Sequence, residues 1–525
     1  MLLESVEIGS FRNFTDKQYV AVEQDVTCLI GKNESGKTTV LKALHRLNPA
    51  NNADAFNETK DYPRRHLSRD RRRAAGTLEA VVPVSASFVL EDGDIDVLAA
   101  EFGGVSFPPS VRVKAWRTYG GDLWVDLICD FRDAVEAACR EAGAEEEDIE
   151  ALIEHQDRES VIAAAKEMAK TLTAARGKAV GRVPAVLAKY DALLAEGISE
   201  EQEQAVLDRI PRFFYFSDYE LLKGECDLND LAERVKAGSL GEGDETILSL
   251  LRLAGEGPDD FLEEEYDSRK AELQAASIEL SQQVFKYWKQ NDALTVVFDT
   301  DMPVVGTDPQ TQQEIRHRIL KIELRDERHG VETNFSTRSA GFQWFFSFLA
   351  AFGAYQDSPE RVVVLLDEPG TSLHGEAQGD FLRYIFGELG QNQQVLYTTH
   401  SQHMIDPTRY ETMRAVHDQA TREHPELGVV ITPVSLSADR NTILPVEAAL
   451  GYTVAKHLFF GSGPHTAVEG SSDFVFLAQM SEYLVSKGRT GVNIQPMRVR
   501  LWVARVAAGV TGRMPARVVA RGCRA

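Results

Sequence analysis

Short alternating runs of apolar and polar residues fill the first 30 positions of the chain, and this period of two predicts β-strands. The apolar positions are Leu3, Val6, Ile8, Val20, Val22 and the continuous run from Val26 to Ile30. Residues 78–90 and 111–128 have the same character. The run at 26–30 leads directly into a glycine-rich turn, so the N-terminal part predicts strands that feed such a turn.

A helical pattern replaces the strand pattern between about residues 131 and 290. Ala, Glu, Lys, Gln and Leu dominate there, and larger residues recur at helical spacing, as at Leu262, Tyr266, Leu273, Leu280 and Val284. This stripe fits either an ordinary buried helix face or a coiled-coil partner surface. Few heptads are sustained, so we favour the buried face. The segment predicts a helical arm.

Beyond residue 290 the strand pattern returns. Leu294–Phe298 and Ile319–Leu324 predict strands, and an apolar helix is predicted around Phe342–Phe352. The run Val362–Leu366 is continuously apolar, which is typical of a parallel strand buried on both faces. The C-terminal half therefore predicts an α/β arrangement.

Composition narrows the class of protein. A chain of 525 residues suggests roughly two to four domains. Its net charge of −24 argues against binding nucleic acid over the whole surface, so any DNA contact needs a local basic patch. The five cysteines contain no CxxC pair, which favours a reduced compartment. No segment has the apolar length of a membrane span, and we expect a cytoplasmic protein.

The glycine-rich turn has the spacing of a phosphate-binding loop. It reads Gly-x-x-x-x-Gly-Lys-Thr after a predicted strand and before an amphipathic helix. Glycines let backbone N–H groups surround the β-phosphate, Lys37 adds a positive charge, and Thr38 offers a hydroxyl to Mg²⁺. The candidate ATP-binding residues are Gly31, Lys32, Asn33, Glu34, Ser35, Gly36, Lys37, Thr38 and Thr39.

Two further strand ends carry candidate chemistry. After Val362–Leu366, Asp367 is a candidate metal ligand and Glu368 a candidate base for the attacking water. His400 ends a later apolar strand, where a side chain can sense the γ-phosphate. Phosphoryl transfer needs this kind of charge placement more than covalent chemistry.

Ser339 and Gly341 form a small-residue turn before the predicted apolar helix, and a helix N-terminus of this kind binds anions. Within one chain this turn is redundant with the first loop. We therefore expect it to reach the nucleotide of a second copy.

These motifs, read in order as GKNESGKT, RSAGF, VLLDEP and TTHS, resemble the ABC-type ATPases, which include SMC, Rad50 and RecF-like proteins. With the later VEGSSDF, the chain resembles the OLD (overcoming lysogenization defect) family, in which a Toprim nuclease domain follows the ATPase. The resemblance extends to about residue 497 and implies an α/β, ABC/RecF/SMC-like P-loop ATPase with a helical arm insertion and a partial Toprim α/β domain. It also implies an ATP-dependent homodimer or higher oligomer, DNA as a partner, and a helicase-like or other phage-defence partner protein.

The same resemblance implies roles for single residues. Asp367 holds Mg²⁺, Glu368 polarises water, His400 acts as the switch, and Ser339 and Gly341 complete the site across a dimer. The signature Arg338-Ser-Ala-Gly-Phe departs from the Leu-Ser-Gly-Gly-Gln of transporters. No Q-loop residue can be assigned.

The resemblance also implies a metal site for Mg²⁺ or Mn²⁺ in the C-terminal region. Glu469 matches the first Toprim acid and Asp473 the added acid of the next helix, but alone they also fit a strand end beside a helix N-terminus. Residues 483–525 contain no Asp or Glu and eight Arg, so the Toprim Asp-x-Asp element is absent. We interpret this as a frameshift or truncation near residue 497; the alternative is a basic arm for nucleic acid.

A second basic cluster, YPRRHLSRDRRR, spans Tyr62–Arg73 soon after the phosphate loop and contains six arginines. A solvated loop, a contact to the DNA backbone and a lid over the nucleotide all fit it.

The expected domains are 1–130 and 291–445 for the two ATPase parts, 131–290 for the helical insertion and candidate dimerisation arm, 446–497 for the start of the Toprim domain, and 498–525 for the aberrant tail. The leading hypothesis is an ATPase that regulates a Toprim DNA endonuclease whose site is incomplete. The alternatives are a competent nuclease completed by other residues and a non-nuclease, SMC/RecF-like clamp or scaffold gated by ATP.

Overall fold

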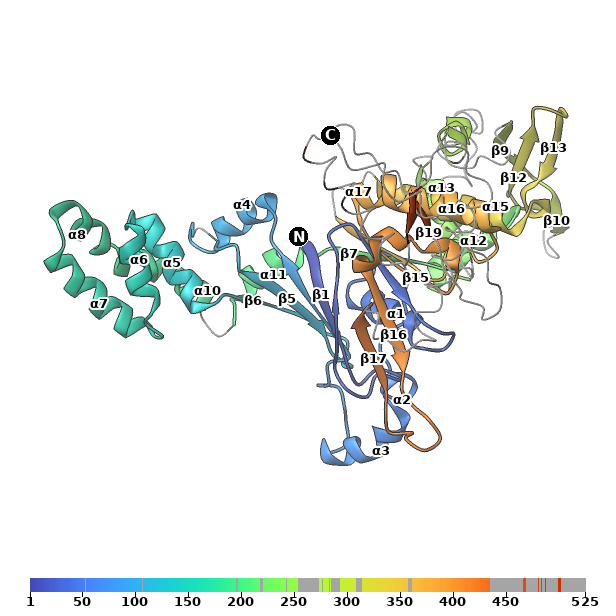
Figure 1. The fold of residues 1–525 in the computed structure, drawn as a ribbon. Helices are drawn as coiled ribbons and strands as arrows, with labels where there is room; N and C mark the ends of the chain where they lie inside the picture. Colours follow the sequence, from blue (N-terminus) through green and yellow to red (C-terminus); the bar gives the residue numbers. More distant parts are fainter. Residues whose placement is uncertain are drawn as a thin grey trace, which may run out of the picture. The chain divides into compact units, whose positions relative to one another are not determined.

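The structure is a computed structural model, shown in Figure 1. It describes residues 1–51, 53–105, 107–194, 197–217, 221–241, 243–253, 273–275, 277–282, 284, 293–307, 314–356, 361–434, 466–468, 480, 483, 487 and 499–501. The chain divides into two compact units, Met1–Pro445 and Val446–Ala525, and each is described by itself.

An antiparallel sheet forms the N-terminal part of the first unit. Its strand order is β2-β1-β4-β5-β6. The strands are β1 (Leu2–Ile8), β2 (Gln18–Ala21), β4 (Val84–Val89), β5 (Arg112–Arg117) and β6 (Leu123–Ile128). The alternating pattern of the sequence therefore predicted strands correctly, because one face of this sheet is buried and the other is more exposed.

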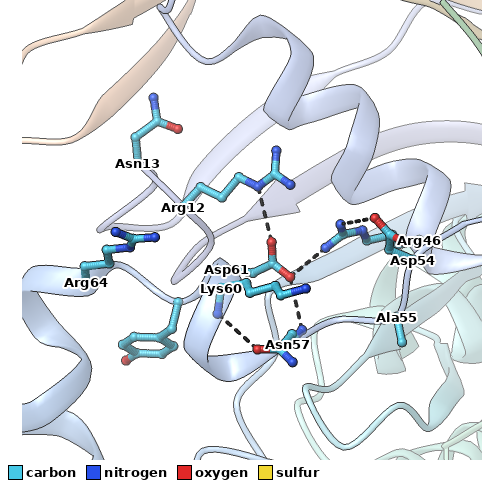
Figure 2. Close-up of a pocket in the computed structure, with 10 residues that line it drawn as sticks. Arg12, Asn13, Arg46, Asp54, Ala55, Asn57, Lys60, Asp61 and Arg64 are labelled. Atoms are coloured by element: carbon cyan, nitrogen blue, oxygen red, sulfur yellow. Dashed lines mark hydrogen bonds and ion pairs between the residues drawn. The ribbon is translucent and has the colours of Figure 1, made fainter. Parts of the chain in front are cut away.

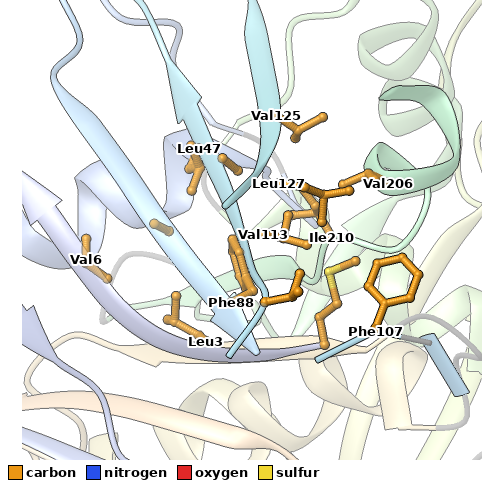
Figure 3. Close-up of a cluster of buried hydrophobic side chains, with 14 of the residues drawn as sticks. Leu3, Val6, Leu47, Phe88, Phe107, Val113, Val125, Leu127, Val206 and Ile210 are labelled. Carbon is orange, nitrogen blue, oxygen red and sulfur yellow. The ribbon is translucent and has the colours of Figure 1, made fainter. Parts of the chain in front are cut away.

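The buried face of this sheet carries the main apolar core. Figure 3 shows Leu3, Val6, Phe88 and Val113 of the sheet together with Leu47 of α1 (Lys37–Leu47) in one cluster. Burying side chains of this size contributes about 1.5–3 kcal/mol each. The helix that follows the glycine-rich turn is thereby fixed against the sheet.

A second, mostly parallel sheet has the order β17-β16-β3-β15-β14-β7. Its strands are β3 (Val26–Ile30), β7 (Arg212–Phe216), β14 (Val362–Leu366), β15 (Gln394–Thr399), β16 (Met413–Asp418) and β17 (Val429–Pro433), and only β17 runs antiparallel to its neighbour. Every residue of β3, β14 and β15 is buried, which explains their continuous apolar character. The parallel strands β3, β14 and β15 are neighbours, and they end at one edge of the sheet.

An aromatic layer covers one side of β7. Trp344 and Phe348 of α15 (Ala340–Gln356) contact Phe216, and both also pack edge-on against Phe381 of α16 (Gly375–Tyr384). Interlocked rings of this kind contribute about 0.5–1.5 kcal/mol beyond their buried area. They hold α15 and its N-terminus in a fixed position on the sheet.

A helical insertion leaves the first sheet after β6 and returns at β7. It consists of α5 (Phe131–Ala142), α6 (Glu146–Ile153), α7 (Arg158–Thr171), α8 (Ala174–Val180), α9 (Val183–Leu187), η1 (Ala188–Tyr190), α10 (Asp191–Leu194) and α11 (Glu200–Leu207). Asp130 caps the start of α5, and Gly143 ends it in the left-handed conformation at φ 80°. Val135, Leu152 and Tyr190 lie in its buried core.

The insertion is shorter than the arm expected over residues 131–290. The aromatic run Arg212–Phe216 has high β-propensity and pairs with β14, so the chain re-enters the ATPase sheet at this point. Of the apolar stripe, Leu273, Leu280 and Val284 are buried, whereas Leu262 and Tyr266 lie outside the described residues.

A small sheet of order β13-β12-β8, with β9 also pairing to β12, and the hairpin β10–β11 follow. Their bounds are β8 (Glu225–Asp227), β9 (Leu294–Asp301), β10 (Val304–Thr307), β11 (Glu314–Arg316), β12 (Ile319–Asp326) and β13 (Val331–Asn334). The remaining elements of the first unit are α2 (Glu58–Asp61), α3 (Arg64–Arg73), α4 (Asp92–Glu101), α12 (Leu228–Ala237), α13 (Asp244–Leu253), η3 (Phe335–Thr337), η4 (Ile385–Leu389), α17 (Gly390–Asn392), η5 (Gln402–Met404) and η6 (Pro407–Thr412).

The second unit is described only in part. β18 (Thr466–Val468) pairs in parallel with β19 (Val499–Leu501). In the described part of the whole chain, no helix has the length and apolar character needed to cross a membrane.

Candidate functional site

The predicted motifs meet at the carboxyl edge of the parallel sheet. β3 lies next to β15, and β15 lies next to β14. The loops at Gly31, Asp367 and His400 therefore follow three neighbouring strands. Ligands of open α/β sheets bind at this edge.

The geometry of the first loop requires its glycines. Gly36 has φ of 104° at the start of α1, a conformation that glycine adopts without strain. A Cβ atom on Gly31 would lie 2.3 Å from the carbonyl oxygen of Val416. The outer residues Lys32, Asn33 and Glu34 are exposed, whereas Ser35 and Thr39 are buried.

Lys37 turns back into its own loop. Its ammonium group donates hydrogen bonds to the carbonyl oxygens of Gly31 (3.0 Å) and Lys32 (2.9 Å) and lies 3.4 Å from Glu368 Oε1. Burial lowers the pKa of Lys37, and the nearby Glu368 carboxylate opposes this shift. Lys37 is thus a buried cation held by two carbonyl dipoles and one carboxylate. A bound phosphate can take the place of these partners.

Both oxygens of Asp367 accept hydrogen bonds from hydroxyl groups. Oδ1 accepts from Thr38 Oγ1 (2.9 Å) and Thr398 Oγ1 (2.8 Å), and Oδ2 accepts from the Tyr215 hydroxyl (2.9 Å). Carboxylate and hydroxyl oxygens are the ligands that Mg²⁺ prefers. Thr38 and Asp367, which are 329 positions apart in the sequence, are joined in one candidate metal site.

Tyr215 was not predicted from the sequence. It lies on β7, where the Asn51 amide bonds to both its backbone N–H (3.1 Å) and its carbonyl (2.8 Å). The His45 ring stacks on the Tyr215 ring with centroids 5.4 Å apart. Burial raises the pKa of Tyr215, and the Asp367 charge adds to this shift, so the phenol stays a donor. The aromatic run 212–216 favours a strand, although the sequence analysis predicted helix over 131–290, and only the pairing of β7 with β14 reveals the role of Tyr215.

Glu368 is held by contacts on both sides. Its backbone N–H donates to Thr398 Oγ1 (2.7 Å), and its Oε2 lies 3.0 Å from His400 Nδ1. Its φ of 49° is left-handed, a costly conformation for a residue with a side chain, of the kind that concentrates at functional sites. His400 is 44% exposed and so can reach a ligand from the same edge.

Ser339 and Gly341 do not join this network. Ser339 precedes α15, and its Oγ accepts the Phe342 N–H at 3.4 Å. A Cβ on Gly341 would lie 2.7 Å from Leu373 Cδ2, so this position packs on the segment after Asp367-Glu368. Among the hydrogen bonds of the described residues, none connects Ser339 or Gly341 to residues 31–39.

A charged cavity of about 760 Å³, lined in part by Arg12, Asn13 and Asp61, was also not predicted from the sequence. Figure 2 shows Asp61 between two arginines: Oδ1 accepts from Arg12 Nε (3.3 Å) and Oδ2 from Arg46 Nη1 (2.7 Å). Asn13, which lines the cavity, lies 3.2 Å from where a Cβ of Gly36 would be. Asn13 therefore lies between the cavity and the start of α1. The motif FRNF at 11–14 gave no signal that pointed to it.

The predicted Toprim ligands cannot be added to this geometry. Glu469 and Asp473 lie outside the described residues, although β18 ends at Val468, directly before Glu469. Their assignment stays a prediction.

The described residues fit a nucleoside triphosphate with Mg²⁺. Ser35 Oγ in the loop is buried without a hydrogen-bond partner, as expected of a group reserved for a ligand oxygen. Lys37 supplies charge, and Thr38 with Asp367 offers hard oxygen ligands.

A match to a known protein family agrees with this fit. The family described as "AAA ATPase domain" matches residues 1–106 and 215–405, which leaves out 107–214 with the helical insertion. No curated protein matches the chain. Similar solved structures include an SMC head bound to the C-terminal winged-helix domain of ScpA (12% identity, 83% of this chain, 98% of that chain, TM-score 0.38). The SMC head domain from Thermotoga maritima is another (11% identity, 83% of this chain, 100% of that chain, TM-score 0.32). A third is the Smc head domain with an extended coiled coil bound to the C-terminal domain of ScpA, from Pyrococcus furiosus (13% identity, 83% of this chain, 96% of that chain, TM-score 0.36).

Proposed function

The chain belongs to the AAA ATPase domain family, which implies ATP binding and hydrolysis. On this premise we propose that the chain is a DNA-acting protein of the OLD type, in which ATP hydrolysis regulates a Toprim nuclease domain. In this proposal ATP closes a homodimer, and the C-terminal unit carries an incomplete Toprim nuclease site.

One observation carries the ATPase part of the proposal. Thr38, Asp367, Thr398, Glu368 and His400 form a continuous chain of contacts of 2.7–3.0 Å at one sheet edge. Such a preorganised set reduces the reorganisation needed in the transition state of phosphoryl transfer.

The roles follow from the atoms that each residue presents. A triphosphate in the loop offers Lys37 anionic oxygens in place of Glu368, so Glu368 becomes free to accept a proton from water. Thr38 and Asp367 would hold Mg²⁺, which when bound compensates the charge of the phosphates. His400, beside Glu368, orients that carboxylate. The nucleoside would occupy the cavity of Arg12, Asn13 and Arg64.

Dimer formation is supported by the position of Ser339. Its helix has no described hydrogen bond to the loop of its own chain, yet its N-terminus offers N–H groups to an anion. In the proposal this N-terminus binds the γ-phosphate of a second copy.

The ATPase and dimer parts are tested together. Glu368→Gln protein with ATP and Mg²⁺ should be a dimer in analytical ultracentrifugation, and Glu368→Gln with Ser339→Arg should be a monomer. A dimer that forms without ATP and persists in the Ser339→Arg variant would contradict the proposal.

The nuclease part has a separate test. Purified protein is incubated with supercoiled plasmid and Mg²⁺ or Mn²⁺, and we expect little cleavage because residues 483–525 contain no Asp or Glu to serve as further metal ligands. Strong cleavage that Glu469→Ala abolishes would show that the site is complete. ATP-dependent dimers that retain closed circular DNA without cutting it would instead favour the alternative function, a non-nuclease clamp gated by ATP.

A further inference from the structure

The basic cluster at Arg64–Arg73 forms the helix α3, which has two different faces. At about 100° per residue, Arg64, Arg65, Ser68, Arg69, Arg72 and Arg73 fall within roughly half of the helix circumference. These six residues are exposed, whereas His66, Leu67, Asp70 and Arg71 on the other half are intermediate in burial. We call Arg64, Arg65, Arg69, Arg72 and Arg73 the arginine face.

The opposite half attaches α3 to the ATPase unit. Arg71 Nη2 donates to Glu58 Oε2 of α2 at 2.7 Å, and the Tyr62 hydroxyl donates to Asp70 Oδ2 at 3.1 Å. Leu67 packs against the apolar core. The helix, labelled α3 in Figure 1, is thus fixed in orientation, and the residues of its arginine face are exposed.

The charges of the arginine face are mostly unpaired. Arg69 pairs with its neighbour Asp70 at 2.8 Å. Within the described part of the chain, no hydrogen bond or ion pair involves the side chains of Arg64, Arg65, Arg72 or Arg73. In a protein with net charge −24, such a concentration of unpaired arginines is a local exception.

We propose that the arginine face of α3 binds the phosphodiester backbone of nucleic acid. The helix is about 15 Å long, and duplex DNA carries a charge roughly every 1.7 Å along its axis, so one strand edge can engage several arginines at once. A single nucleotide cannot, because Arg65 and Arg73 are about 12 Å apart along the helix. Arg64 alone of this face lines the nucleotide cavity.

An acidic peptide is less favoured than nucleic acid. Every basic residue of α3 except His66 is arginine, whose planar fork matches phosphate oxygens in pairs. A row of five arginines over ten residues also matches the charge density of a phosphate backbone better than that of most peptides.

The inference deepens the proposed function, because it names the surface through which a DNA-acting ATPase contacts DNA. Binding is measured without hydrolysis, so the two can fail separately. If the wild-type protein showed no ATPase activity, the proposed function would be wrong, but the inference that the arginine face binds DNA would still stand.

The experiment measures binding of a fluorescent duplex of about 30 base pairs by anisotropy at several KCl concentrations. Three proteins are compared: the wild type, Arg65→Gln/Arg72→Gln/Arg73→Gln, and the control Lys166→Gln/Lys170→Gln/Lys178→Gln. The control removes the same charge from exposed positions of the helical insertion. Thermal unfolding of all three verifies that they are folded.

We expect the arginine variant to lose affinity by about ten-fold or more near 0.1 M salt and to lower the salt slope by about 2–3, because each phosphate contact contributes about 0.9. The control should stay within about two-fold of the wild type. Equal loss in the control would show a general charge effect and overturn the proposal. So would undiminished binding by the arginine variant, no binding by the wild type, or tighter binding of poly-glutamate than of DNA.

Discussion

Asp367 and Arg65 are both charged residues of the first unit, but they are surrounded in opposite ways. Asp367 accepts hydrogen bonds from three hydroxyls on three separate elements. Arg65 faces solvent on a helix without a buried residue. A change at the nucleotide site therefore disturbs a set of partners, whereas a change on the arginine face removes only one charge. Substitutions in the two regions should therefore differ in the size of their effects.

The largest effect is expected for Glu368→Gln. The change keeps the size of the side chain but removes the carboxylate that we propose accepts a proton from water, so ATP turnover should fall by about 10²–10⁴-fold. Phosphate release measures turnover, and binding of a fluorescent ATP analogue should persist.

The matched control is Glu376→Gln, an exposed acid at the start of α16. It should leave turnover unchanged. Full activity in Glu368→Gln would mean that another group activates the water.

A pH-dependent loss of stability is expected from His45. Burial lowers its pKa from 6.5 to about 4. Between these values the unfolded chain binds a proton that the native state does not, so stability is complete above about 6.5 and falls as the pH drops towards 4. From pH 7.5 to pH 5 this residue should cost about 2 kcal/mol.

Urea unfolding of the wild type and His45→Gln at both pH values measures this cost. His45→Gln should lack the additional loss on acidification. An identical pH dependence in the two proteins would show that His45 is protonated without cost in the folded state.

Tyr215→Phe tests how far the network depends on a residue outside the motifs. The ring can keep its stacking on His45, but Asp367 loses one hydrogen bond. Removing a partner that orients a metal ligand typically costs 10–100-fold, so we expect about ten-fold more Mg²⁺ for half-maximal ATPase activity.

Tyr355→Phe is the control, because its hydroxyl donates to the Ala50 carbonyl and not to Asp367. It should leave the Mg²⁺ requirement unchanged. A normal Mg²⁺ requirement in Tyr215→Phe would reduce Tyr215 to a packing role.

The motifs found in the sequence are those whose residues are neighbours in the chain. Gly31 to Thr38 and Asp367-Glu368 each follow one strand, so spacing alone revealed them. Tyr215 and the cavity around Asp61 depend on which strands and helices become neighbours, and β7 meets β14 only after a separation of about 150 residues. The helical spacing of 131–290 likewise hid the short strands β7 and β8, because segments of five and three residues weigh little in a long window.

The smallest effect should come from the two halves of α3. Arg65→Gln/Arg72→Gln/Arg73→Gln should change the free energy of unfolding by less than about 0.5 kcal/mol, because exposed charges without partners contribute little to folding. Arg71→Gln should cost about 1 kcal/mol, since it breaks a 2.7 Å ion pair with a carboxylate that also accepts the Leu78 N–H. Urea midpoints measure both. If the triple variant were the less stable of the two, the arginine face would be part of the fold, and its exposed charges would no longer argue for a ligand.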